Sequence, residues 1–122
     1  MRVNKVIDLL EQGQPAYTTM VPAQDLGHEG GLEWAQTWAD LLLVSFEHRP
    51  FDTNGLADFM RGLKDGGPTA SGHATPAVVA SLPANAVTRE EIAANVWQAR
   101  HLLTTGVHGL WVDHARDPDA VR

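Results

Sequence analysis

The stretch LLLVSFEHRPFD, residues 41–52, changes from apolar to ionisable within a few positions. Five of its first six residues are apolar, and Glu47, His48 and Arg49 then follow directly before a proline. A near-continuous apolar run of this length is typical of a strand that is buried on both faces, as in a parallel sheet. The three ionisable residues therefore lie either at an ordinary strand end in water or at the rim of an active site.

Length and composition indicate the general class of protein. The 122 residues form a single domain, 1–122, and 43% hydrophobic content supports a modest core. The net charge is −6 and the basic residues are scattered singly, so we expect no nucleic-acid partner. No apolar run reaches the roughly 18 to 20 residues of a membrane span, and no signal-peptide pattern opens the chain, so we expect no membrane partner. The chain has no cysteine, which fits a reducing compartment, and we expect a cytoplasmic location.

Hydrophobic periodicity predicts helices and strands in strict alternation. Helices are predicted from about residue 3 to 12, over 32–39, after Asp52 and after Thr88, and the segment 27–31 is predicted as a loop. Strands are predicted over 15–21, 40–46, 75–82 and 107–115. This alternation predicts an α/β fold of parallel β/α units.

Capping residues mark the starts of two of these helices. Asp52 is an N-cap candidate, and Thr88 with Glu91 forms a capping box. Each helix is also predicted to have one apolar face. These faces comprise Leu56, Phe59, Met60 and Leu63 in the first helix, and Ile92, Val96, Ala99 and Leu103 in the second.

The C-terminal segment carries a strong helix-start signal. Asp117 is a potential N-cap and Pro118 would occupy the first helical position, but the chain stops after about one turn. So short a helix does not sustain itself, because nucleation is costly. The alternatives are a frayed tail or, as we prefer, the front part of a longer sheet-and-helix protein or of one completed by a partner.

Two further patterns have a functional and a structural interpretation. His101, His108 and His114, near Asp113, have side chains that suit zinc or manganese. His101 is predicted on a helix, however, and the other two are six residues apart across a strand, so we expect separate histidines. The glycine-rich segment 65–73 is either an anion cradle or a flexible loop, and the absence of a Walker lysine favours the loop.

Several segments together resemble the HpcH/HpaI aldolase family, which is related to citrate lyase β subunits. The segments are NKVIDLLEQGQPAYTTMV (4–21), WADLLLVSFEHRPFD (38–52), TPAVVASLP (75–83) and LLTTGVHGLWVDHARDPDAVR (102–122). The most specific element is SFEHRP (45–50), set against the family's usual Asp-x-Glu-His-x-Pro. The resemblance implies the first half of a (β/α)8 TIM-type barrel, whose active site lies at the carboxyl ends of the strands.

The resemblance also implies a chemistry. The activity would be that of a metal-dependent carbon–carbon lyase acting on a 2-oxo acid such as pyruvate together with an aldehyde. His48 would act as general base, and Glu47 would orient the imidazole or metal-bound water. The divalent metal, Mg²⁺, Mn²⁺ or Co²⁺, would stabilise the enolate, and its ligands would lie on later strands outside these residues.

Three family positions differ in this chain. The substrate-binding arginine after the third strand is replaced by Ala80 and Ser81, which cannot make a bidentate contact to a carboxylate. The aspartate partner of the histidine falls at Thr104, and the strand-end aspartate at Ser45. A non-catalytic half-barrel that acts as an assembly or binding module is therefore the alternative function. In either case we expect a homo-oligomer or a complementary C-terminal half as partner.

Overall fold

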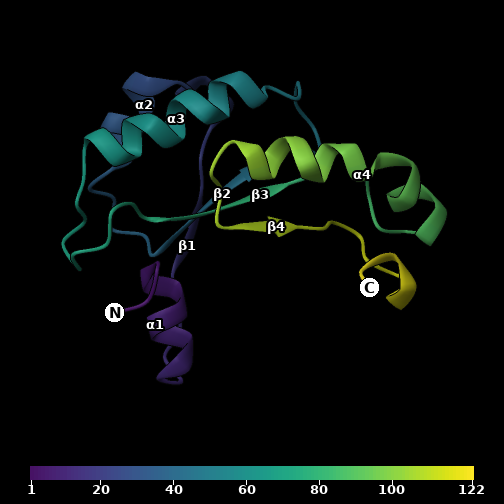
Figure 1. Cartoon of the computed structure of the whole chain (residues 1–122), viewed down its shortest axis with the longest axis horizontal. Coiled ribbons are helices and arrows are strands. Elements are labelled where there is room, and N and C mark those ends of the chain that lie inside the picture. The colour runs from purple at the N-terminus through teal and green to yellow at the C-terminus, as the bar shows by residue number, and fades with distance from the viewer.

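The computed structural model describes all 122 residues as one parallel sheet with helices between its strands (Figure 1). The strands are β1 (Thr18–Met20), β2 (Leu41–Ser45), β3 (Ala77–Ser81) and β4 (Gly109–Trp111). The helices are α1 (Lys5–Glu11), α2 (His28–Trp34), α3 (Thr53–Asp65) and α4 (Arg89–Thr104), with short 3-10 helices η1 (Ala23–Asp25) and η2 (Pro118–Ala120). The predicted α/β class and parallel sheet are confirmed. None of the helices combines the length and apolar character that a membrane span requires.

The strands lie side by side in chain order, β1-β2-β3-β4. The longest pairing joins β2 to β3 over five positions, beginning with Leu41 opposite Ala77. Thr18 of β1 also lies opposite Leu41, and Gly109 of β4 lies opposite Val79. Because every pairing is parallel, all four strands end at the same edge of the sheet.

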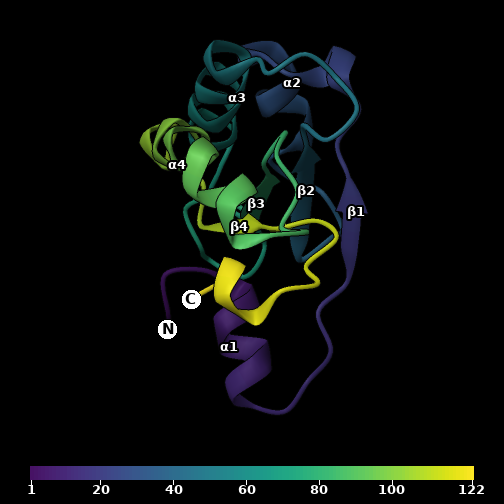
Figure 2. The same cartoon turned by 90° about the vertical axis from the view of Figure 1, so that its right-hand side faces the viewer.

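The core lies between the sheet and the helices α2, α3 and α4. Both views show these three helices on one side of the sheet, with α1 beyond the opposite side (Figure 2). Alternate strand residues face the helices, and these are Leu42, Val44, Val78 and Ala80, all fully buried. The residues between them, Leu41 and Leu43, are only half-buried. The prediction that β2 is buried on both faces was therefore wrong, because no helix covers its second face.

The second helix begins earlier than predicted. The segment 27–31, predicted as a loop, lies largely within α2, and the helix ends at Trp34. Trp38, which falls within the helix predicted over 32–39, lies outside α2 and is exposed. Glycine disfavours helices, and that preference misled the prediction. Here Gly31 is buried where α2 crosses α3, and tertiary packing overrides the local propensity.

The last helix, α4, faces the core only in part with the predicted residues, of which Ala99 packs against the core. Val96 and Leu103 are exposed, whereas Gln98 and Leu102 are buried. The reason is a kink at Asn95, whose φ of −120° and ψ of 15° are not helical. The Asn95 side chain donates a 2.8 Å hydrogen bond to the carbonyl of Glu91, and such local bonds compete with helical geometry. The kink breaks the simple periodicity from which the apolar face was predicted.

The predicted caps are present. The Asp52 side chain accepts a hydrogen bond from Gly55 N–H, and Thr88 accepts one from Glu91 N–H. The predicted apolar face of α3 is buried as expected. At the C-terminus, Asp117 caps the single turn of η2, in which Ala120 is buried. This turn is therefore packed in place.

Helices α2 and α3 approach each other through two glycines. A Cβ atom added to Gly31 would lie 2.2 Å from the carbonyl oxygen of Phe59, and one added to Gly62 would lie 2.1 Å from the carbonyl oxygen of His28. Both distances are far below van der Waals contact. The close crossing of these helices therefore requires glycine at both positions.

The close crossing of α2 and α3 predicts that an alanine at position 62 destabilises the fold. Gly62→Ala should gain helix propensity, by up to about 1 kcal/mol. The clash with the α2 backbone should outweigh that gain and lower the free energy of unfolding, because overpacking typically costs about 1–3 kcal/mol. Urea unfolding will measure the difference. Gly109→Ala is the matched control, since its Cβ would meet no atom closer than 3.5 Å. A Gly62→Ala variant more stable than wild type would contradict the close crossing.

Candidate functional site

The carboxyl edge of the sheet brings together ionisable side chains from distant parts of the chain. Glu47 follows β2, and His114 follows β4. One carboxylate oxygen of Glu47 lies 2.6 Å from Nε2 of His114 and 3.5 Å from Nε2 of His48. The parallel topology creates this cluster, because strands β2 and β4 end at the same edge. Glu47 therefore lies between two imidazoles.

The members of the cluster differ in exposure. The side chain of Glu47 is 15% exposed, whereas that of His48 is 87% exposed and reaches into solvent. The arrangement is thus a fixed acceptor beside a freely accessible imidazole. The hydrogen bond of Glu47 goes to His114, and His48 lies near the same carboxylate without a hydrogen bond to it.

The sequence did not predict that His114 would contact Glu47, because His114 was considered there only as a metal ligand. Its backbone has a φ of 53°, in the left-handed region that residues other than glycine rarely adopt. Such strained residues occur often at functional sites. The sequence signal that could have identified His114 is its place just after β4, at the edge where Glu47 follows β2.

Arg49 is held beside this cluster. Its Nε donates to the carbonyl of Ser45, and Nη1 donates to the carbonyl of Val21 at 3.1 Å. The guanidinium also lies 5.4 Å from the centre of the Phe46 ring. Burial lowers the pKa of this guanidinium, and its Nη2 is buried without a hydrogen-bond partner in the protein. Arg49 is therefore held in place with one donor atom that the protein leaves unsatisfied.

An open pocket of about 390 Å³ lies over these residues. The lining comes from the ends of β1 and β2, and comprises Met20, Val21, Pro22, Ala23, Ser45, Glu47, His48 and Arg49. The pocket thus contains a carboxylate, an imidazole and a guanidinium on an otherwise apolar surface. It is large enough for a small organic acid.

The positions that depart from the family pattern have structural roles. Ala80 is fully buried in the core, and the Ser81 hydroxyl donates to the Ser45 hydroxyl at 3.0 Å. The hydroxyl of Thr104 donates to the carbonyl of His101 within α4. None of these residues supplies a charge to the cluster.

The remaining histidines do not gather. The ring of His101 packs edge-on against Trp97. Nδ1 of His108 accepts a 3.0 Å hydrogen bond from Val78 N–H, and burial lowers the pKa of this imidazole. No three His, Asp or Glu side chains in the chain are arranged to hold a metal ion. These residues therefore form no metal site of their own, and the resemblance places the metal ligands on later strands outside them.

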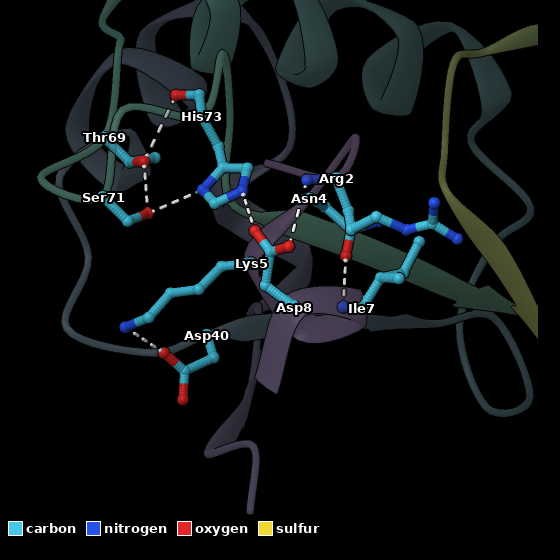
Figure 3. A network of polar contacts seen from close by, with 9 residues as sticks. All are labelled: Arg2, Asn4, Lys5, Ile7, Asp8, Asp40, Thr69, Ser71 and His73. Carbon is cyan, nitrogen blue, oxygen red and sulfur yellow. Dashed lines mark hydrogen bonds and ion pairs between the residues drawn. The ribbon is translucent and has the colours of Figure 1, made fainter. Parts of the chain in front are cut away.

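A second polar network lies at the opposite, amino edge of the sheet (Figure 3). Nε2 of His73 donates to Asp8 at 2.9 Å, which leaves Nδ1 to accept from the Ser71 hydroxyl at 2.8 Å. His73 is only 4% exposed. Lys5 pairs with Asp40 at 2.6 Å. These bonds tie α1 to the segments that precede β2 and β3.

The side chains Ser71, His73 and Asp8 have the composition of an acyl-transfer triad. Ser71 also contacts the Thr69 hydroxyl at 3.0 Å, and Asp8 also accepts from Arg2 N–H at 3.0 Å. The group lies at the amino edge, where residues of β/α folds serve stability rather than catalysis. We therefore interpret it as a structural connection.

Comparison with protein-family models, with curated proteins and with solved structures gives no match for this chain. The candidate site therefore depends on its own geometry.

The amino-edge network predicts a pH dependence of stability. The hydrogen bond from Arg2 N–H, together with the contact to His73, holds the pKa of Asp8 below its ordinary value of about 3.9. A lowered folded-state pKa stabilises the protein above the ordinary value, and that stabilisation is lost as the pH falls through the folded pKa. Asp8→Asn should therefore lower the urea midpoint near neutral pH and reduce the loss of stability on acidification below about pH 4.

A matched control separates this effect from general acid sensitivity. Asp65 pairs with His28 at 2.7 Å on the exposed surface, where ion pairs contribute little. Asp65→Asn should leave the acid dependence close to that of wild type. If Asp8→Asn and Asp65→Asn have the same profile, Asp8 does not stabilise the fold in the way described.

Proposed function

We propose that the carboxyl edge of the sheet binds a small 2-oxo acid, such as pyruvate, and moves a proton at the carbon next to its carbonyl group. This proton transfer is the first step of a carbon–carbon lyase reaction with an aldehyde. The observation that carries the proposal is the Glu47 carboxylate held between His48 and His114 beside an open pocket. The sheet would then be the first half of a (β/α)8 barrel, and the absence of cysteine supports a cytoplasmic location.

In this proposal His48 is the general base. Its imidazole is the accessible member of the cluster, and neutral imidazole accepts protons near physiological pH. Glu47 stabilises the imidazolium that forms when His48 takes the proton. His114 donates to the same carboxylate and holds it in place. The proton moves from the substrate carbon to His48, and returns from it to the new product.

Arg49 is the proposed anchor for the substrate carboxylate. The family arginine is absent at Ala80 and Ser81, whereas Arg49 lines the pocket, and its buried Nη2 has no partner within the protein. A guanidinium–carboxylate contact is charge-assisted and directional. It would hold the 2-oxo acid with its reactive carbon near the imidazole.

In the family that the chain resembles, a divalent metal stabilises the enolate as a Lewis acid. This chain brings no three ligating side chains together, and we assign no step to a metal. The residues named above account for binding and for movement of the proton.

A second candidate function is that of an assembly module without catalysis. The uncovered face of the sheet favours it, because Leu41 and Leu43 are apolar residues that no helix of this chain buries. The two candidates differ in a direct observable, since only the first predicts exchange of substrate protons.

Proton exchange tests the lyase proposal. In heavy water, the chain should exchange the methyl protons of pyruvate, followed by the loss of the methyl signal in proton NMR. His48→Ala should slow this exchange by roughly 100-fold, the effect expected when a general base is removed. Measurements with and without Mg²⁺ or Mn²⁺ will show whether added metal contributes.

The matched control is His28→Ala. Its Nε2 pairs with the Asp65 carboxylate at 2.7 Å, which repeats the imidazole–carboxylate contact away from the pocket. This variant should exchange pyruvate protons at the wild-type rate. Equal rates for wild type and His48→Ala would exclude His48 as the base, and no exchange by wild type with or without metal would leave the assembly function as the better candidate.

A further inference from the structure

One face of the sheet lacks a covering layer. Strand residues alternate between the two faces, so Leu43 and Val79 point away from α2, α3 and α4, and both are half-buried. Met20 on β1 and Trp111 on β4 border the same face at its two edges, and are 57% and 47% exposed. We call these four residues, with Leu41, the open face. It is an apolar surface at the centre of the molecule.

Helix α1 adds to this surface. It lies on the side of the sheet away from the other helices (Figure 1), and none of its residues is buried. Its apolar residues include Val6, Ile7 and Leu10. An amphipathic helix normally buries its apolar face against the core. Here the chain covers that face only in part, since Val6 and Ile7 are half-buried and Leu10 is exposed.

Both outer strands are also unpaired on one side. β1 and β4 are each three residues long and run in the same direction. Their outward N–H and C=O groups are free to pair with another strand. Because β1 and β4 run in the same direction, β1 of one copy could pair in parallel with β4 of another.

The exposed area is larger than the mass of the chain predicts. The chain exposes 6999 Å², whereas a folded monomer of 13.2 kDa exposes about 6,400 Å². The excess is about 600 Å². A stable interface buries about 800 Å² on each partner, so the excess approaches what one such interface would cover.

We propose that the open face binds a second copy of this chain. The β1 strand of each copy would pair in parallel with β4 of the other around a two-fold axis, and the two sheets would form one closed ring of eight strands. A two-fold arrangement is self-complementary and pairs both edges at once. Closure also removes the free edges. The open faces of the two copies would fill the interior of the ring with side chains, as in closed parallel barrels.

This assembly completes the candidate pocket. Met20 lines the pocket that holds Glu47, His48 and Arg49, and β1 is the strand at its outer side. Pairing would place the second copy's β4, with Trp111 at its end, beside this strand. The pocket would then be bounded by both copies. The inference develops the assembly function proposed above, and it stands whether or not the pocket is catalytic.

Sedimentation provides the first test. At about 100 µM, where a micromolar Kd leaves most chains paired, wild type should sediment at twice 13.2 kDa. Met20→Glu and Trp111→Glu should each restore the mass of one chain, because a charge would enter an apolar interface. Trp38→Glu is the matched control, since Trp38 is exposed but lies outside the open face, and it should remain paired. A wild-type monomer, or a dimer unaffected by both open-face variants, would overturn the proposal.

Cross-linking provides a second test that does not depend on disruptive variants. The chain has no native cysteine. Within one copy, three strand spacings of about 4.8 Å separate β1 from β4, which is beyond the reach of a disulfide. Met20→Cys chains mixed in turn with Gly109→Cys and Trp111→Cys chains should therefore cross-link only between copies. One of these mixtures should give a covalent pair under mild oxidation.

The controls for cross-linking are internal. Met20→Cys alone should not cross-link, because the two Met20 positions would lie across the ring from each other. A mixture of Met20→Cys with Trp38→Cys should not cross-link either. Cross-linking in these controls equal to that in the β1–β4 mixtures would contradict the ring. Failure of pyruvate exchange would leave this result untouched, so the two proposals can fail separately.

Discussion

The parallel pairing of β2 with β3 is the constraint on which the rest of the structure depends. It runs from Leu41 opposite Ala77 to Ser45 opposite Ser81 and is the longest pairing in the sheet. Its register places Leu42, Val44, Val78 and Ala80 on one face, where α3 and α4 bury them. It also aligns the strand ends, so that the segment after β2 meets the segment after β4. A one-residue slip of this register would expose the core residues and separate the ionisable cluster.

The two faces of the sheet are stabilised in different ways. On the helical face, the apolar residues of β2 and β3 are fully buried, and the glycine contact between α2 and α3 brings their backbones close together. On the other face only α1 is present, and polar bonds at its base hold it. Asp8 contacts His73, and Lys5 contacts Asp40. Burial alone would raise the pKa of Asp40. The hydrogen bonds from Lys5 and Tyr17 N–H and the charge of Lys5 outweigh this effect and lower the pKa below its ordinary value, so the carboxylate stays ionised. Electrostatic attachment thus replaces apolar packing where the sheet is open.

Much of the fold could be predicted from local sequence signals. The caps at Asp52 and Thr88 and the apolar face of α3 are local signals, and the structure contains all of them. The errors arose where tertiary contacts decide the outcome. Gly31 is tolerated in α2 because α3 crosses there, and the Asn95 kink turns the buried face of α4. In the candidate site, Glu47 and His48 were predicted from the resemblance and from their place after an apolar strand, whereas His114 required the spatial order of the strands.

The two ends of the sheet also differ in how fully their polar groups are satisfied. At the amino edge, the carboxylate of Asp8 and both ring nitrogens of His73 have hydrogen-bond partners. At the carboxyl edge, Nη2 of Arg49 and one carboxylate oxygen of Asp113 are buried without partners, and His114 has a strained backbone. Unsatisfied buried groups and strained backbone both cost stability, and they persist where the surrounding structure enforces them. The chain thus places its satisfied network at the edge that anchors α1, and its unsatisfied groups at the edge that bears the pocket. This difference between the two edges is what a β/α unit requires if one edge is to maintain the fold while the other remains available to a ligand.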